Sequence, residues 1–156
     1  MHAWWIILIV GTIAAILLFA WRSVHATLRE ARFAKVRRNF HGQREHLEAK
    51  FIRLASARSK SRFPRWEDCD FDDDVAYVRN RTTGELCAFV EVTVATAGSV
   101  EAPFGSLRAG TAVFRFDRTR WETDGKAFLN LSPTEAIRVF QNDLEMVEQE
   151  LAHKTW

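Results

Sequence analysis

The sequence predicts an α+β protein with an N-terminal transmembrane helix, a basic helical stem, and an antiparallel meander of four to five strands with a C-terminal helix packed on it. Three observations predict this order. An uncharged apolar run opens the chain, a helical repeat of apolar residues follows, and after Arg65 the repeat changes to the alternation typical of strands. We therefore expect an anchor at 1–21, a stem at 22–60 and a small α+β domain at 61–156.

The first segment has no charged side chain between Ala3 and Trp21. A helix over this run would be about 28 Å long, close to the hydrocarbon thickness of about 30 Å. Trp4, Trp5 and Trp21 lie at its ends, where indole rings favour the headgroup region. No Lys or Arg precedes it, and residues 18–21 lack the cleavage pattern of a secretory signal. We therefore expect a retained, single-pass signal-anchor.

Basic residues follow the apolar run directly. The positive-inside rule then predicts the cytoplasmic (inner) membrane as the location, with the N terminus outside and the C-terminal domain in the cytoplasm. The predicted partner of this flank is a bilayer with anionic headgroups, where each basic side chain contributes about 1 kcal/mol. Nucleic acid is a weaker alternative, because no nucleic-acid-binding module follows. The predicted membrane-surface residues are Arg22, Arg29, Arg32, Lys35, Arg37 and Arg38.

The rest of the chain consists of a basic segment followed by an acidic segment. Residues 22–65 carry 13 Lys/Arg and 3 Asp/Glu, a net charge of +10, and residues 66–156 carry 9 Lys/Arg and 17 Asp/Glu, a net charge of −8. The formal charge of +2 for the whole chain conceals this division. Sign asymmetry of this kind indicates separate tasks for the two segments.

The stem has the pattern of an amphipathic helix. Apolar residues recur at every seventh position along it, at Phe33, Phe40, Leu47 and Leu54. Gly42 costs about 1 kcal/mol relative to alanine in a helix interior, so the stem can divide into helices over roughly 22–41 and 43–59. The stripe allows a coiled coil, and hence a homo-oligomer through the stem. We favour packing of the second helix on the chain's own sheet, because Gln43 and Lys50 interrupt the second seam position.

The domain after the stem begins with strands. A Gly-containing loop at 81–85 predicts a hairpin, and the most apolar strand, 86–95, should be central. The alternation predicts strands over 68–72, 75–80, 86–95, 111–116 and 121–131, the last with a tight turn at Asp124-Gly125.

A helix should close the domain. Ser132 is a suitable N-cap, Pro133 suits the first helical position, and Glu135 completes a capping box. Apolar residues at helical spacing continue to Leu151, so we expect the helix to reach residue 152.

Several motifs resemble those of a known family. They are SLRAGTAVFR at 106–115, WETDGK at 121–126 and FLNLSPTEAI at 128–137, with further similarity at 44–48 and 66–71. Together they are similar to a family of short, uncharacterised membrane-anchored proteins of planctomycete-type bacteria, over roughly residues 40–148. The resemblance implies a bacterial source and the inner membrane. It implies no activity and no site residue.

An acidic cluster is the most evident candidate for chemistry. Asp68, Asp70 and Asp72 match the opening of a Ca²⁺-binding loop. The match then fails, because Asp73 stands where the loop needs glycine and Arg79 stands where it needs a bidentate glutamate. We therefore treat the three aspartates as weak metal candidates and favour a solvent-exposed acidic strand face.

Other catalytic patterns are missing from the sequence. All five histidines lie outside 65–150, so the predicted sheet holds no Ser-His-Asp or Cys-His pair. Cys87 lies in the middle of an apolar strand, where a buried and inert thiol is typical. We therefore expect no catalytic residue, no cofactor-binding residue and no cofactor, and we expect that the chain is not an enzyme.

The expected function is a non-enzymatic interaction or assembly module that binds another protein. The alternative is a small-ligand-binding or enzymatic domain of cystatin-like or NTF2-like shape, which is an analogy at the level of the fold. A cleft lined by Tyr77, Trp121 and Phe128 would favour the alternative.

Overall fold

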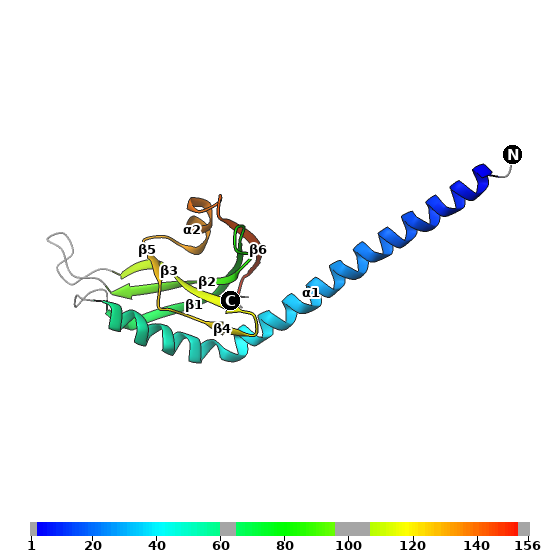
Figure 1. The fold of residues 1–156 in the computed structure, drawn as a ribbon. Helices are drawn as coiled ribbons and strands as arrows, with labels where there is room; N and C mark the ends of the chain where they lie inside the picture. The colour runs from blue at the N-terminus through cyan, green and yellow to red at the C-terminus, as the bar shows by residue number, and fades with distance from the viewer. Residues whose placement is uncertain (1–2, 60–64, 96–106, 153–156) are drawn as a thin grey trace. The chain divides into compact units, whose positions relative to one another are not determined.

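The structure is a computed structural model, and it describes residues 3–59, 65–95 and 107–152. The chain divides into two compact units, Met1–His41 and Gly42–Trp156. The elements, shown in Figure 1, are α1 (Ala3–Arg58), β1 (Arg65–Asn80), β2 (Leu86–Ala95), β3 (Leu107–Asp117), β4 (Arg120–Glu122), β5 (Ala127–Leu129), α2 (Pro133–Val139) and β6 (Leu144–Glu150).

Helix α1 is continuous over 56 residues. The division into two helices that the sequence allowed at Gly42 does not occur, because the helix passes through this residue without a break. A Cβ built on Gly42 would meet no atom within 4 Å. The local penalty of one glycine is therefore too small to interrupt a helix whose flanking residues favour the helical state.

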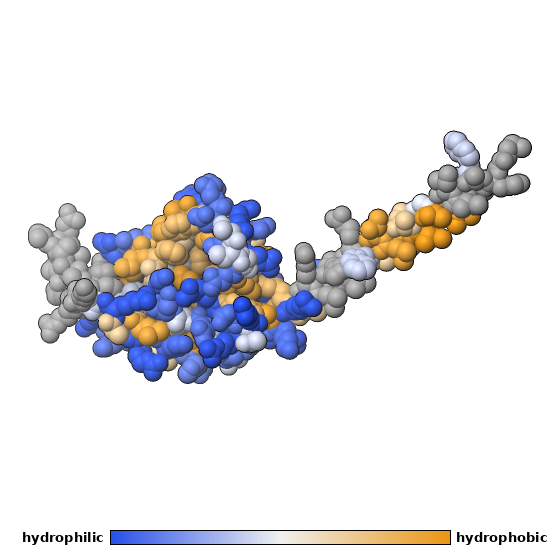
Figure 2. Space-filling model, viewed as in Figure 1, coloured by the Kyte–Doolittle hydropathy of each residue, from blue (hydrophilic) through white to orange (hydrophobic). Residues whose placement is uncertain are grey.

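The predicted transmembrane helix is wrong. In the described part of the chain, no helix is long and apolar enough to cross a membrane. This finding also overturns the expected single-pass signal-anchor and the inner-membrane location. The helix also continues beyond Trp21 into basic residues, so no separate segment ends there. Many apolar side chains of this part of α1 are exposed, among them Ile13, Leu17 and Phe19 (Figure 2).

Six strands form one antiparallel sheet in the order β4-β3-β2-β1-β6, and β5 also pairs with β3. The predicted α+β class and antiparallel sheet are confirmed, with six strands in place of four or five. Strand β2 has the predicted bounds and lies in the middle of the order. Both of its faces are largely buried, because layers of side chains cover the sheet on each side.

The second half of α1, from Gly42 onward, covers one face of the sheet. The ring centroid of Phe51 lies 5.4 Å from that of Trp66, 5.7 Å from that of Phe71 and 5.9 Å from that of Phe114. Leu47 and Ala55 are also buried. Packing of this helical segment on the chain's own sheet is therefore confirmed.

Helix α2 covers the other face (Figure 1). Its Ala136 and Ile137 join a core cluster with Ala76, Val78, Cys87 and Phe89. The predicted capping box is confirmed, since the Ser132 side chain accepts from the Glu135 amide and the Glu135 carboxylate accepts from the Ser132 amide.

The predicted extent of the last helix is wrong. Helix α2 ends at Val139, with Phe140 as its C-cap, and Leu144–Glu150 is strand β6, paired with β1. The helical spacing of apolar residues there is real, but β1 offers a backbone partner that a local pattern does not reveal. Tertiary pairing therefore prevails over the local preference.

Candidate functional site: an acidic groove between α1 and β1

A break in strand pairing creates the site. Phe71 of β1 lies opposite Val92 of β2, and the next paired residues are Val75 and Val90. Strand β1 thus advances four residues where β2 advances two, so Asp72, Asp73 and Asp74 lie outside the regular ladder. Backbone carbonyls that have no hydrogen bond from the neighbouring strand need other donors when they lie against protein.

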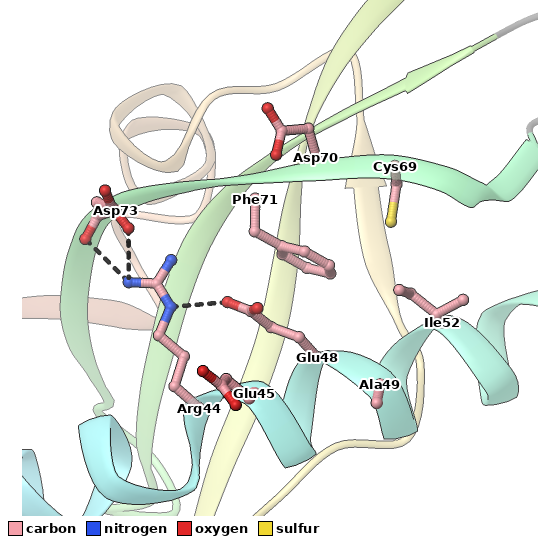
Figure 3. A pocket seen from close by; sticks show the side chains of 9 residues that line it. All are labelled: Arg44, Glu45, Glu48, Ala49, Ile52, Cys69, Asp70, Phe71 and Asp73. Carbon is pink, nitrogen blue, oxygen red and sulfur yellow. Dashed lines mark hydrogen bonds and ion pairs between the residues drawn. The ribbon is translucent and has the colours of Figure 1, made fainter.

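Arg44 of α1 supplies those donors. Its Nη1 donates to the Asp73 carbonyl at 3.1 Å, and its Nη2 donates to the Asp72 carbonyl. Its Nε donates to Oε1 of Glu48, one turn along the helix, at 2.7 Å (Figure 3). The Arg44 side chain is only 15% exposed, so these contacts are partly shielded from solvent. Arg44 therefore connects the helix to the irregular part of β1 through hydrogen bonds.

A cavity of about 530 Å³ lies beside this contact. The side chains of Cys69 and Phe71 point from β1 toward the helix, whereas the Asp70 carboxylate points away from it (Figure 3). The cavity is lined by Arg44, Glu45, Glu48, Ala49, Ile52, Cys69, Asp70, Phe71 and Asp73. Apart from Asp70, three of these residues are acidic and one is basic, so the groove has an excess of negative charge.

The Cys69 thiol in this groove is protonated at neutral pH. Its pKa is raised to about 11, first by burial and then by the negative charges of Glu48, Asp70 and Asp68, against the opposing effect of a backbone hydrogen bond. The thiolate is the reactive form of cysteine, so this environment suppresses nucleophilic chemistry. Burial likewise raises the pKa of Cys87 to about 11, and Cys87 is buried as predicted.

The weak metal candidates do not converge. Asp68 forms an ion pair with Arg65 at 2.7 Å, and the Asp72 carboxylate accepts from the Asp74 amide at 3.3 Å. Asp68, Asp70 and Asp72 are all exposed. Within the ranges that the structure describes, no group of three or more His, Cys, Asp or Glu residues is placed to hold a metal ion.

The predicted membrane-surface residues all lie on α1. Arg32, Lys35 and Arg38 are exposed and Arg37 is half-buried, whereas the side chains of Arg22 and Arg29 lie outside the described residues. Nothing in the structure tests their expected contact with anionic headgroups, which stays a prediction.

The cleft that would have favoured an enzymatic or ligand-binding domain is not formed by the expected residues. Tyr77 and Trp121 are buried against each other, with ring centroids 6.2 Å apart. Phe128 instead packs on Phe89 and Phe140, with centroid distances of 5.9 and 5.1 Å. Phe89 belongs to the cluster under α2, so these aromatic residues fill two separate layers of the core.

The sequence-based reasoning missed Arg44 and Glu48 as site residues. Their i, i+4 spacing of opposite charges was the available signal, since such residues are neighbours on a helix surface. The contact of Arg44 with two carbonyls had no sequence signal, because it depends on the irregular pairing of β1.

No protein-family model matches the chain, and no curated protein or solved structure matches it either. The resemblance to the planctomycete-type family therefore stays a prediction. The geometry of the groove is the basis for the function proposed below.

Proposed function

We propose that the unit Gly42–Trp156 is a non-enzymatic protein-interaction module whose groove between α1 and β1 receives a Lys or Arg side chain of a partner protein. One observation carries the proposal. The groove is rich in carboxylates, and its single lining cation, Arg44, already binds Glu48 and the carbonyls of Asp72 and Asp73.

The remaining negative charge lies at the rim. Glu45 is exposed, and the Asp73 side chain is 82% exposed, with Oδ1 3.7 Å from Nη1 of Arg44. Exposed ion pairs contribute only about 0.2–1 kcal/mol each, so charge alone gives weak binding. Ala49, Ile52 and the ring of Phe71 add apolar surface. A lysine or arginine side chain matches both features, because its aliphatic stem covers apolar surface while its charged head meets the carboxylates.

The chemistry of Cys69 supports binding over catalysis. It is the one thiol among the groove-lining residues, and its pKa of about 11 keeps it protonated near neutral pH. A catalytic cysteine requires the opposite environment, in which positive charge or a helix N-terminus lowers the pKa.

Site-specific photo-crosslinking in the native cells tests the proposal. A photoreactive residue in place of Ala49, which is exposed and lines the groove, should form covalent adducts with a partner protein. The same residue in place of Gln141, which is exposed in the turn after α2, is the matched control and should not form them. Asp73→Lys should abolish the adducts. It removes the carboxylate that lies 3.7 Å from Nη1 of Arg44, but it keeps the Asp73 backbone carbonyl to which Nη1 donates at 3.1 Å. Absence of adducts at position 49, or adducts that persist in Asp73→Lys, would contradict the proposal.

A small-ligand-binding domain is the second candidate. The cavity volume of about 530 Å³ favours it, since small-molecule sites commonly occupy about 300–1,000 Å³. The excess of carboxylates selects an organic cation as the ligand class. Saturable calorimetric binding of a simple diamine that Asp73→Lys abolishes, together with an absence of crosslinked protein, would favour this candidate.

A further inference from the structure

Strand β6 forms one edge of the sheet. It pairs with β1 on one side, and within the described ranges no strand pairs with its other side. A seven-residue edge strand presents backbone amides and carbonyls that can pair with an extended segment of another chain. The opposite edge is less suitable for such pairing, because β4 has only three residues.

A bulge in β6 changes which face of the strand each side chain lies on. Tyr77 lies opposite Glu148 and Val78 lies opposite Met146, so Val147 is an extra residue between two paired positions. Side chains alternate between the faces of a strand, and without this bulge Glu145 and Glu148 would point to opposite faces.

With the bulge, the three glutamates of β6 share one face. Glu145, Glu148 and Glu150 lie opposite the alternate β1 residues Arg79, Tyr77 and Val75. Directly paired residues project to the same side of a sheet. This side is the one that α1 covers, since the α2 cluster contains the intervening residues of β1, Ala76 and Val78.

The other face of β6 is mainly apolar. Met146 lies opposite Val78 and is 42% exposed, and Leu144 packs against the cluster under α2. Gln149, opposite Ala76, completes this face. The edge strand thus offers carboxylates on one side of its backbone and apolar surface on the other.

We propose that β6 accepts, as an additional strand, an extended segment of a partner protein in which basic and apolar residues alternate. Its basic side chains would lie on the α1 face, where Glu145 is exposed, and its apolar side chains would lie beside Met146. This inference rests on the proposed function as a protein-interaction module and adds the second contact surface and the conformation of the partner.

The end of β6 lies beside the irregular segment of β1. The amide of Ala152, just beyond β6, donates to Oδ1 of Asp74 at 2.6 Å, and Asp74 belongs to the irregular segment of β1 that Arg44 binds. A second copy of this chain fits the edge less well, because its own β6 would bring further glutamates to the same face. Like charges on directly opposed strands are destabilising.

The probe for this inference is a synthetic peptide of the same length as β6 in which Lys and Val alternate. We expect it to bind the full chain and to slow hydrogen exchange at backbone amides of β6. A Glu–Val alternating peptide is the control and should not bind. Glu145→Gln should weaken binding about two- to fivefold, the loss expected for one cross-strand charge pair. Gln149→Lys is the matched variant, since it changes the charge by the same amount on the opposite face, and it should weaken binding less.

Three results would overturn the inference: no binding of the Lys–Val peptide, binding without added protection in β6, or equal losses in Glu145→Gln and Gln149→Lys. Binding without protection in β6 that Asp73→Lys abolishes would place the peptide in the groove. That result would refute strand addition and leave the proposed function intact.

Discussion

Gly125→Ala should destabilise the fold because the loop between β4 and β5 lies directly against α1. Gly125 is buried, with φ of +72°. A Cβ added there would lie 2.8 Å from the Ala55 amide nitrogen, 2.8 Å from the Leu54 Cβ and 2.9 Å from the Leu54 carbonyl carbon. Two of these three atoms are backbone, so a rotamer change cannot relieve the clash.

Two separate costs make up the expected effect. Left-handed backbone costs a non-glycine residue about 1–2 kcal/mol, partly offset by about 0.4–1 kcal/mol from the reduced entropy of the unfolded chain. Overpacking against the helix adds about 1–3 kcal/mol. Gly84 is the matched control, because its φ is also +72° and its added Cβ would meet nothing within 4 Å. We expect Gly84→Ala to cost about 1 kcal/mol and Gly125→Ala about 2–4 kcal/mol.

Urea unfolding of the full chain measures both variants. The buried Trp66 and Trp121 provide a fluorescence signal for loss of the core. Equal destabilisation by the two substitutions would refute the close packing of the β4–β5 loop on the second half of α1.

Three further predictions concern the cap of α2, metal binding and the Asp124 carboxyl group. Ser132→Ala should lower the free energy of unfolding by about 0.5–2 kcal/mol, because the Glu135 amide loses its acceptor; an unchanged urea midpoint would show that the cap is dispensable. Millimolar Ca²⁺ or Mg²⁺ should leave Tm unchanged, whereas a site filled at a hundredfold excess over Kd would add about 2.7 kcal/mol; a rise in Tm that disappears in Asp70→Asn would contradict this expectation. Burial alone would raise the pKa of Asp124, but hydrogen bonds from Lys126 and nearby positive charge outweigh burial and hold this pKa below 3.8. The resulting stabilisation is complete above pH 3.8 and is lost as the pH falls through the folded-state pKa, so Asp124→Asn should reduce the loss of stability in acid; an unchanged acid-unfolding profile would refute it.

Local patterns predicted the elements whose partners lie close in sequence. The bounds of β2 followed from its apolar alternation, and the start of α2 followed from Ser132 and Glu135. Both signals are complete within a few residues, so the rest of the fold does not alter them.

The elements that were mispredicted depend on distant parts of the chain. The segment Leu144–Glu150 has apolar residues at helical spacing, yet it pairs with β1, which precedes it by more than sixty residues. Likewise, whether the Asp72 and Asp73 carbonyls bond to β2 or to Arg44 depends on the register between β1 and β2. Neither register is encoded in a short window, so neither β6 nor the role of Arg44 could be derived from the sequence.

The groove itself can be tested most directly by titrating the full chain with trilysine and following backbone amide NMR shifts. The proposal predicts the largest shifts at the groove residues of α1 and β1, Glu45, Glu48, Cys69 and Asp73, and their disappearance in Glu45→Lys. The same charge reversal at Asp117, which is exposed at the end of β3 and does not line the groove, should leave them in place. Shifts confined to residues outside the groove, or shifts equally sensitive to both reversals, would contradict the account.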